Sequence, residues 1–373
     1  MIMKNPAEKE RYQRQISLKE LGEIGQQKLK DARVLVIGAG GLGCPALLYL
    51  AGAGIGRIGI VDFDLVSLSN LHRQILFSVN DIGLSKALRA GDILEQINPL
   101  IEIIVFNEKM NTANALEILR GFDIILDGTD NFASRYMIND ACVILNKTLV
   151  YGAISRFEGQ IAIFNSLSDT ETPVNYRDLF PQAPSDGEVL NCEEAGVIGV
   201  LPGIIGTMMA NETIKLITGI GEPLINKLLT YNSLNNSFFE MELLARPETG
   251  LIIPAGADEF KLYNYDGFCS LHSDLELRHE DFEQMLDDSN VQIIDIRESG
   301  ETSQTKDFDH INIPLSRLKE QIPDIDAEKI VLFCQSGKRS AVAAEILKKH
   351  YGHSKKIYSL KGGIMEWFKM KNL

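Results

Sequence analysis

The chain has 373 residues, 45% of them hydrophobic, and a formal net charge of −14 at pH 7. This length exceeds what one hydrophobic core usually serves, so two domains are expected. The negative charge disfavours nonspecific binding to nucleic acid, and local basic clusters must then bind local anions such as phosphates. No apolar run approaches the length of a membrane helix, and the N-terminal segment is too polar for a signal peptide. We therefore expect a cytoplasmic protein that contacts no membrane.

The first part of the chain alternates strand-like and helix-like patterns. Arg33–Gly54 is typical of a strand, a glycine-rich turn and a helix. The elements expected after it are a strand at Arg57–Asp64, a strand at Ile101–Asn107, a helix at Asn111–Phe122, a strand at Asp123–Asn131, a helix at Ser134–Lys147, a strand at Thr148–Ile154, a helix at Gly203–Gly219 and short strands within Lys227–Leu244. This order predicts a Rossmann-like, doubly wound α/β sheet.

A second, smaller α/β domain is expected after a stretch punctuated by proline and glycine. A helical pattern at His279–Leu286, a strand pattern at Val291–Glu298 and the segment around Cys334 belong to it. We predict a first domain over residues 1–250, a linker over residues 251–274 and a second domain over residues 275–373.

The glycine-rich turn has the spacing G-x-G-x-x-G at Gly38, Gly40 and Gly43, and Asp62 ends the next strand. By itself this spacing indicates NAD or FAD. The physical requirement is broader, because the glycines admit phosphates to a helix N-terminus and an aspartate accepts ribose hydroxyls. Any adenosine phosphate would fit such a site.

The residues that follow favour ATP. Asn70, Arg73 and Lys86 supply donors for a triphosphate, more than a hydride-transfer enzyme needs. The sequence DGTDN adds Asp127 and Asp130 as Mg²⁺ candidates at a strand's carboxyl end, where ligands of α/β sheets bind. We therefore expect ATP and Mg²⁺ at this edge.

The loop CQSGKRS, starting at Cys334, lies between the apolar run Ile330–Phe333 and a helix-like segment. A cysteine that ends a strand before a short loop and a helix lies at the focus of backbone N–H groups, which favour an anion. Lys338 and Arg339 add positive charge, so we expect Cys334 to react as a thiolate nucleophile. The five scattered cysteines of the chain form no regular disulfide framework, which suits a reducing compartment.

From about residue 10 to 247 the chain resembles the MoeB/ThiF adenylyltransferases, relatives of ubiquitin-activating enzymes. The segments that carry this resemblance are RYQRQ, GAGGLGCP, VDFDLVSLSNLHRQ, DGTDN and CEEAGVIGVLPGIIG. The tail, with IIDIRE, FDHINIPLS and CQSGKRS, resembles a rhodanese domain. This pairing resembles the fused adenylyltransferase–sulfurtransferases of molybdopterin synthesis, thiamin synthesis or tRNA thiolation. The resemblance implies adenylation of the C-terminal glycine of a ubiquitin-like sulfur carrier, followed by replacement of AMP with sulfur to give a thiocarboxylate.

The resemblance also implies roles for individual residues. Asp62 would bind ribose, Asp130 would bind Mg²⁺, and Arg14 would reach the nucleotide of a neighbouring subunit, which implies a homodimer. Cys192 matches the cysteine that can link covalently to the carrier, and Cys334 would hold a persulfide received from a cysteine desulfurase or thiosulfate. The full nucleotide-binding set expected is Arg14, Gly38, Gly40, Gly41, Gly43, Asp62, Ser69, Asn70, Arg73, Gln74, Lys86, Asp130 and Asn131.

One departure concerns zinc, which such enzymes usually hold with two Cys-x-x-Cys pairs. The corresponding positions here are Asn175, Asp178, Thr249 and Ile252, and none supplies a thiolate. Cys269 and His272 have ligand spacing, but two ligands do not close a site. We therefore expect no structural zinc.

Two other classes of function remain open from the sequence alone. A dinucleotide-dependent oxidoreductase rests on the glycine spacing and predicts thermal protection by NAD or FAD rather than ATP–Mg²⁺. A non-catalytic scaffold for ubiquitin-like partners would have an inactive rhodanese domain, and the intact Cys334 and Asp130 argue against it.

Overall fold

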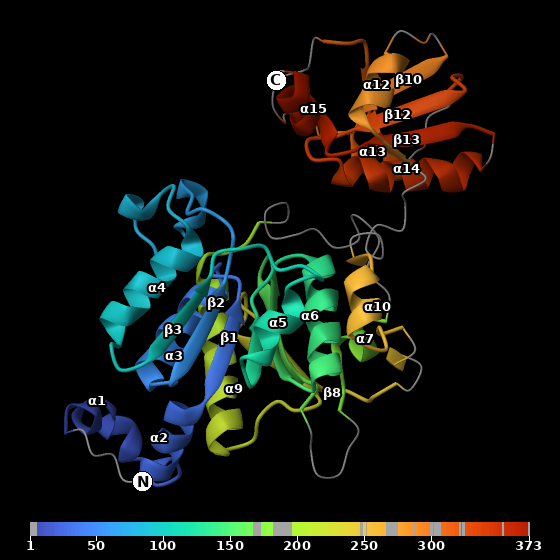
Figure 1. Ribbon diagram of the computed structural model, residues 1–373. Helices are drawn as coiled ribbons and strands as arrows, with labels where there is room; N and C mark the ends of the chain where they lie inside the picture. Colours follow the sequence, from blue (N-terminus) through green and yellow to red (C-terminus); the bar gives the residue numbers. More distant parts are fainter. Residues whose placement is uncertain are drawn as a thin grey trace. The chain divides into compact units, whose positions relative to one another are not determined.

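The structure, a computed structural model, describes residues 6–166, 173–181, 196–246, 249–250, 252–265, 275–286, 288, 290–298, 301, 307–320, 322, 325–352 and 354–371. The chain divides into two compact units (Figure 1). The described part of the first ends at Tyr265, and that of the second begins at Leu275. In these ranges no helix combines the length and apolar character needed to cross a membrane.

An eight-stranded mixed sheet forms the centre of the first unit. Its order is β3-β2-β1-β4-β5-β6-β7-β8, in which β3 to β5 are parallel and each later neighbour is antiparallel. The strands are β1 (Arg33–Ile37), β2 (Arg57–Val61), β3 (Glu102–Phe106), β4 (Ile124–Asp127), β5 (Thr148–Ser155), β6 (Glu158–Phe164), β7 (Lys227–Asn232) and β8 (Ser237–Glu242). β1 and β2 are almost wholly buried, as expected for strands covered by helices on both faces.

Helices cover both faces of this sheet because alternate strand residues point to opposite sides. Val34 and Val36 of β1 pack in one core with residues of α3 and α9, whereas Leu35 lies on the face that holds Phe122. Figure 1 shows α5 and α6 side by side on the near side of the sheet. The helices are α1 (Pro6–Ile16), α2 (Gly22–Asp31), α3 (Gly43–Ala53), α4 (Lys86–Ile97), α5 (Ala115–Arg120), α6 (Phe132–Leu145), α7 (Tyr176–Leu179), α9 (Val200–Thr218) and α10 (Ala257–Leu262), with short 3-10 turns at Leu68–Asn70 and Val79–Asp81.

Local sequence sets where the helices near the sheet edge begin and end. The side-chain oxygen of Ser85 accepts from Leu88 N at the start of α4, and that of Asn131 accepts from Ser134 N at the start of α6. Gly54 ends α3 with φ 84°, a left-handed conformation that glycine adopts without steric cost.

The second unit is built on a five-stranded parallel sheet of order β11-β10-β12-β13-β9. Ile330 and Leu332 of β12 pack toward α13 and α14, whereas Val331 and Phe333 pack toward α12 and α15. The elements are β9 (Glu276–Leu277), α12 (His279–Met285), β10 (Val291–Asp295), β11 (Ile311–Asn312), α13 (Leu315–Glu320), β12 (Lys329–Phe333), α14 (Lys338–Tyr351), β13 (Lys356–Leu360) and α15 (Gly363–Lys371).

The predicted fold class, a Rossmann-like sheet followed by a smaller α/β domain, is confirmed. The sequence analysis missed β6, which makes the first antiparallel pairing with β5. Within the stretch predicted as a linker, α10 packs on α6, and Tyr265 Oη donates to Asp140 Oδ2 at 2.8 Å. Residues 252–265 therefore pack against the first unit.

Candidate functional site

Three neighbouring parallel strands end at the same level of the first sheet. Ile37 of β1 is in register with Val61 of β2 on one side and with Asp127 of β4 on the other. The chain leaves β1 toward β2 and later returns to the opposite side of β1, which is the arrangement that opens a ligand crevice in α/β sheets. The residues that follow the three strand ends are Gly38, Asp62 and Gly128.

The glycine-rich loop is shaped by close backbone contacts. Gly38 has φ 91°, and a Cβ there would lie 3.0 Å from the carbonyl oxygen of Gly128. At Gly43 a Cβ would lie 1.8 Å from the carbonyl oxygen of Gly38, so only glycine fits. The loop leads directly into α3, and the backbone N–H groups at a helix N-terminus are donors that an anion can bind.

Asp62 is buried beside this loop and is fixed by two backbone donors. Its Oδ2 accepts from Ala39 N at 2.7 Å, and its Oδ1 accepts from Asp64 N at 2.8 Å. Burial raises the pKa of the Asp62 carboxyl, while the two backbone N–H donors and the Lys86 charge oppose that rise. Each carboxylate oxygen keeps a lone pair that can accept a ribose hydroxyl.

The predicted phosphate-binding residues converge on the same edge. The almost fully buried Lys86 donates through Nζ to Asp64 Oδ2 at 3.0 Å. Arg73 lies against Gly41, with its Cδ 3.7 Å from where a Cβ on that glycine would stand, and it donates to Ser69 O at 3.2 Å. Gln74 is buried near Gly40, and its Oε1 has no hydrogen-bond partner within the described structure. Asn70 is buried and Ser69 is exposed, so the hydrogen-bond donors of this set include both buried and solvent-accessible side chains.

The two aspartates of DGTDN have different environments. Asp127 is buried, and its Oδ1 accepts from Thr129 N at 2.9 Å and from Thr129 Oγ1 at 2.6 Å. Burial also raises the pKa of the Asp127 carboxyl. Asp127 thus shapes the loop through Oδ1, whereas its buried Oδ2 has no hydrogen-bond partner within the described structure. Its role as a Mg²⁺ ligand stays a prediction. Asp130 and Asn131 are exposed, so Asp130 keeps a carboxylate available for a cation.

Arg135 belongs to this edge, although the sequence analysis did not single it out. It is buried, donates through Nη2 to Thr129 O at 3.1 Å and stacks over the rings of Phe132 and Tyr151. The one feature of the sequence that could have pointed to Arg135 is its position in the first turn of α6, four residues after Asn131. It acts as a support for the DGTDN loop.

Arg14 lies apart from the other predicted residues. It is exposed on α1, and the neighbouring Gln15 donates to the carbonyl oxygen of Ala53, in the last turn of α3. The glycine-rich loop precedes the first turn of α3, a helix of 11 residues. At about 1.5 Å per residue, the length of α3 separates the glycine-rich loop from the helix end that contacts α1 by about 16 Å.

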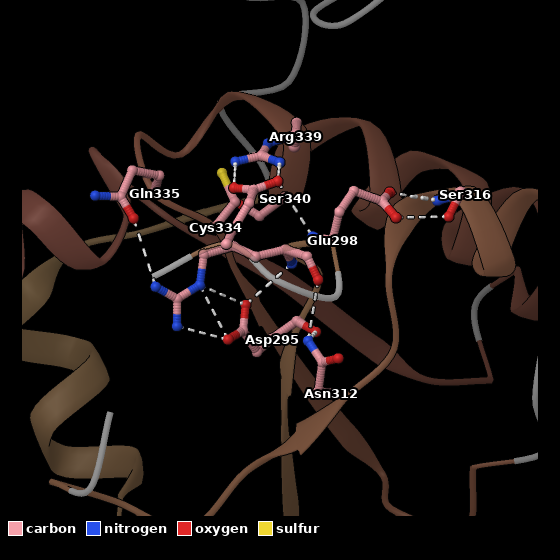
Figure 2. A network of polar contacts seen from close by, with 10 residues as sticks. Asp295, Glu298, Asn312, Ser316, Cys334, Gln335, Arg339 and Ser340 are labelled. Atoms are coloured by element: carbon pink, nitrogen blue, oxygen red, sulfur yellow. Dashed lines mark hydrogen bonds and ion pairs between the residues drawn. The ribbon is translucent and has the colours of Figure 1, made fainter. Parts of the chain in front are cut away.

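In the second unit, Cys334 follows β12 directly and is buried (Figure 2). Its Sγ lies 3.7 Å from Ser340 Oγ, and Ser340 accepts from Ser359 Oγ at 2.8 Å. Gly337 begins α14 with φ 87°, and a Cβ there would lie 2.8 Å from Gly362 N. The loop from Cys334 to α14 is therefore held in a tight curve beside a helix N-terminus, which suits an anionic sulfur.

Asp295 and Arg297 brace this loop from β10. Arg297 donates through Nη2 to Asp295 Oδ2 at 2.6 Å and through Nη1 to Gln335 Oε1 at 3.4 Å. Both charged side chains are buried, so the pair supports the loop from within the core.

Comparison with known proteins identifies both units. The ThiF family model matches residues 12–251, and the rhodanese-like domain model matches residues 278–370. The chain belongs to the ThiF family. The probable adenylyltransferase/sulfurtransferase MoeZ of Mycobacterium tuberculosis is 41% identical, across 96% of this chain and 92% of its own length. The sulfur carrier protein adenylyltransferase of Thermus thermophilus is 46% identical, across 71% of this chain and 97% of its own length.

Among solved structures, the Escherichia coli enzyme MccB crystallised with ATP aligns with a TM-score of 0.55 at 23% identity, over 64% of this chain and 72% of its own. That likeness supports the fold of the first unit. Family membership makes this chain an adenylyltransferase that carries a sulfurtransferase domain, and an adenylyltransferase of this family uses ATP. The oxidoreductase alternative, which rested on the glycine spacing alone, is therefore set aside.

The positions that replace the usual zinc cysteines form a hydrogen-bonded cluster. Asp178 Oδ2 accepts from Asn175 N and Nδ2, both at 2.8 Å. Asp178 Oδ1 accepts from Arg246 N at 2.9 Å and from Thr249 Oγ1. One buried carboxylate thus joins the segment before α7 to a segment about seventy residues later. Cys269, His272 and Cys192 lie outside the described residues.

We expect Asp178→Ala to lower the free energy of unfolding by about 3 kcal/mol, because each buried donor left unsatisfied costs about 1–3 kcal/mol. Chemical denaturation measures this, with Asp92→Ala on the exposed face of α4 as the matched control.

In the wild type, chelator should leave the melting temperature unchanged, and elemental analysis should find well under one zinc per chain. Stoichiometric zinc would contradict the expectation.

Proposed function

We propose that this enzyme adenylates the C-terminal glycine of a ubiquitin-like sulfur carrier that ends in Gly-Gly. The outer sulfur of a persulfide on Cys334 then attacks the acyl adenylate, and AMP leaves. A second thiol attacks Cys334 Sγ in the resulting acyl disulfide, which releases the thiocarboxylate and leaves a disulfide between that thiol and Cys334. The observation that carries the proposal is that one chain joins a ThiF-family unit, with a glycine-rich loop at its sheet edge, to a rhodanese-like unit with an intact cysteine. The relative from Thermus thermophilus, named a sulfur carrier protein adenylyltransferase, supports the class of substrate.

Adenylation demands positioning and charge stabilisation from the protein, because a carboxylate is a weak nucleophile toward phosphorus. The glycine-rich loop and the N-terminus of α3 would bind the phosphates, and Asp62 would accept from the ribose. Arg73 and Lys86 would stabilise charge as the carrier carboxylate attacks the α-phosphate and pyrophosphate leaves. Lys86 is already oriented by Asp64, so a triphosphate would compete with that ion pair.

Asp130 is the residue proposed to hold Mg²⁺. This ion usually takes one or two protein carboxylates, with phosphate and water oxygens completing its shell. Asp130 offers an exposed carboxylate two residues after Gly128, whose carbonyl oxygen lies close to Gly38. The described residues offer no cluster of three or more metal-binding side chains. When bound, Mg²⁺ would supply charge neutralisation at the phosphates.

The sulfur step is proposed to begin with the Cys334 thiolate, which attacks the outer sulfur of a donor and becomes a persulfide. The tight loop and the N-terminus of α14 favour both anions. Cys192 is proposed to link covalently to the carrier during its conversion. The donor would be a cysteine desulfurase or thiosulfate, and the product would serve molybdopterin synthesis, thiamin synthesis or tRNA thiolation in the cytoplasm.

A homodimer is proposed because Arg14 lies one helix length from its own glycine-rich loop. A second copy could bring its Arg14 to this site and complete it. The loop and helix after β2 also expose a row of large apolar side chains, each more than half accessible, that would be covered at such an interface. They are Phe63, Leu65, Leu68, Ile75, Val79 and Leu88.

Hybrid dimers test both the activity and the shared site. Arg14→Ala and Asp130→Ala chains with different tags would be co-expressed, and the dimer carrying both tags isolated. Each variant alone should lack carrier-dependent ATP–pyrophosphate exchange. The hybrid should recover about half of the wild-type rate, because symmetry leaves one of its two sites with both residues intact.

An inactive hybrid would contradict action of Arg14 across the interface. A wild-type enzyme without exchange in the presence of ubiquitin-fold proteins ending in Gly-Gly would contradict the proposed function itself.

A further inference from the structure

An ion pair neutralises Arg339, which lies in the first turn of α14, directly after the turn that follows Cys334. Arg339 donates through Nη2 to Glu301 Oε2 at 2.7 Å and through Nη1 to Glu301 Oε1, a bidentate arrangement that is among the stronger ion-pair geometries. The two side chains are only 25% and 35% exposed, so solvent screens the pair incompletely. Figure 2 shows Arg339 and Cys334 extending from the loop on the same side.

Glu301 is also fixed from its own segment. Glu298 N donates to Glu301 Oε1 at 3.2 Å, while the Glu298 side chain accepts from Ser316 N and Oγ. The bonds and charge of Arg339 lower the pKa of the Glu301 carboxyl, so it is ionised at neutral pH. The carboxylate is therefore a permanent and ordered part of the loop's surroundings.

The other arginine that borders the loop is neutralised in the same way. Arg297 is paired with Asp295 and contacts the loop through Gln335. Both of these guanidinium groups thus face a carboxylate of their own. Of the positive charges beside Cys334, those of Arg297 and Arg339 are therefore each paired with a carboxylate.

The balance matters because sulfur donors differ in charge. With thiosulfate, the Cys334 thiolate bonds to the outer sulfur, the S–S bond of the donor breaks, and sulfite leaves with the electron pair. Both thiosulfate and sulfite carry two negative charges. With a persulfide donor, the same attack on the outer sulfur releases a thiolate, and the donor sulfur carries at most one negative charge.

We propose that Glu301 determines the donor specificity of Cys334, by pairing with Arg339 and so disfavouring free dianionic donors such as thiosulfate relative to a persulfide. This inference rests on the proposed role of Cys334 as a sulfur acceptor. It makes Glu301 a specificity-determining residue that acts through Arg339 and by its own charge.

The test measures persulfide formation on Cys334 in the full-length enzyme, with thiosulfate and cysteine persulfide as donors. Glu301→Gln removes the charge and keeps the shape, and should raise kcat/KM for thiosulfate about tenfold, mainly through a lower KM. For cysteine persulfide the change should stay below about twofold. The control, Glu298→Gln, removes the charge of a carboxylate in the same segment that accepts from Ser316, and should change neither donor's KM by more than about twofold.

Two further measurements separate an electrostatic role from a structural one. The gain with thiosulfate should nearly vanish at about 1 M salt, where the Debye length falls to about 3 Å. In an Arg339→Ala background, Glu301→Gln should raise kcat/KM by no more than about threefold, since no guanidinium is released. A full gain in that background would overturn the role of the ion pair.

An unchanged or higher KM for thiosulfate in a Glu301→Gln enzyme that melts like the wild type would overturn the inference. That result leaves the proposed function intact if the wild type still forms the persulfide. If the wild type accepts sulfur from neither donor, it is the proposed function of Cys334 that fails.

Discussion

Replacing Arg73 or Asp130 with alanine is expected to abolish carrier-dependent ATP–pyrophosphate exchange. Arg73 lies against the glycine-rich loop, and Asp130 offers an exposed carboxylate at the end of β4. Removing one preorganised charge-stabilising group from an active site typically costs about 10²–10³-fold in rate, or about 3–4 kcal/mol. Initial-rate exchange with labelled pyrophosphate, at saturating ATP and carrier, measures the loss.

Matched controls exist at the opposite end of the same sheet. Arg33 and Asp123 form an exposed ion pair where β1 and β4 begin, away from the carboxyl edge. Arg33→Ala and Asp123→Ala should keep exchange within about twofold of wild type, because an exposed pair contributes about 0–1 kcal/mol. Wild-type exchange in both Arg73→Ala and Asp130→Ala would show that the nucleotide site has been assigned to the wrong residues.

Cys334→Ala is expected to lose sulfur transfer completely while it keeps pyrophosphate exchange. The sulfur atom removed is the one that would hold the persulfide, and no other thiol in the described part of the second unit can replace it. The loss should appear with thiosulfate and with a desulfurase donor. Cys142→Ala, a buried cysteine of α6 in the first unit, serves as the control and should keep sulfur transfer. Undiminished transfer to Cys334→Ala would mean that the rhodanese-like domain is not the sulfur relay.

The two proposed thiols are also expected to differ from each other. Cys192→Ala should keep both exchange and persulfide formation on Cys334. It should lose any covalent adduct with the carrier and slow the formation of thiocarboxylate. This pattern of losses would show that the two cysteines act in successive steps and cannot replace each other.

The sheet edge was predictable because its determinants are local and periodic. Gly38, Gly40 and Gly43 follow one strand pattern, and Asp62 follows the next. Both groups therefore lie at the carboxyl ends of parallel strands, where neighbouring strand ends meet. β6 was missed because it continues an antiparallel hairpin from β5, outside the pattern of alternating strands and helices.

What could not be predicted depends on burial and on contacts between distant residues. The sequence alone does not distinguish Asp127 from Asp130. Asp127 is buried because β4 packs between β1 and β5, whereas Asp130 follows the strand and is exposed. The bond between Asp178 and Thr249 spans about seventy residues, and the pair of Glu301 and Arg339 spans almost forty. Neither pairing has a periodicity that a sequence pattern could display. The sequence therefore indicated positive charge at Arg339, whereas the structure pairs that charge with Glu301.

The central claim is that one chain joins adenylation to sulfur transfer on the same carrier, and the mass of the carrier tests it most directly. A ubiquitin-fold carrier ending in Gly-Gly would be incubated with the enzyme, ATP–Mg²⁺ and a cysteine desulfurase supplied with cysteine, and the mass of its C-terminal peptide measured. We predict that one oxygen of the terminal glycine is replaced by sulfur, and that the replacement requires ATP, Asp130 and Cys334 together. A carrier that gains sulfur without ATP, or that is adenylated by the wild type and never gains sulfur, would contradict the account.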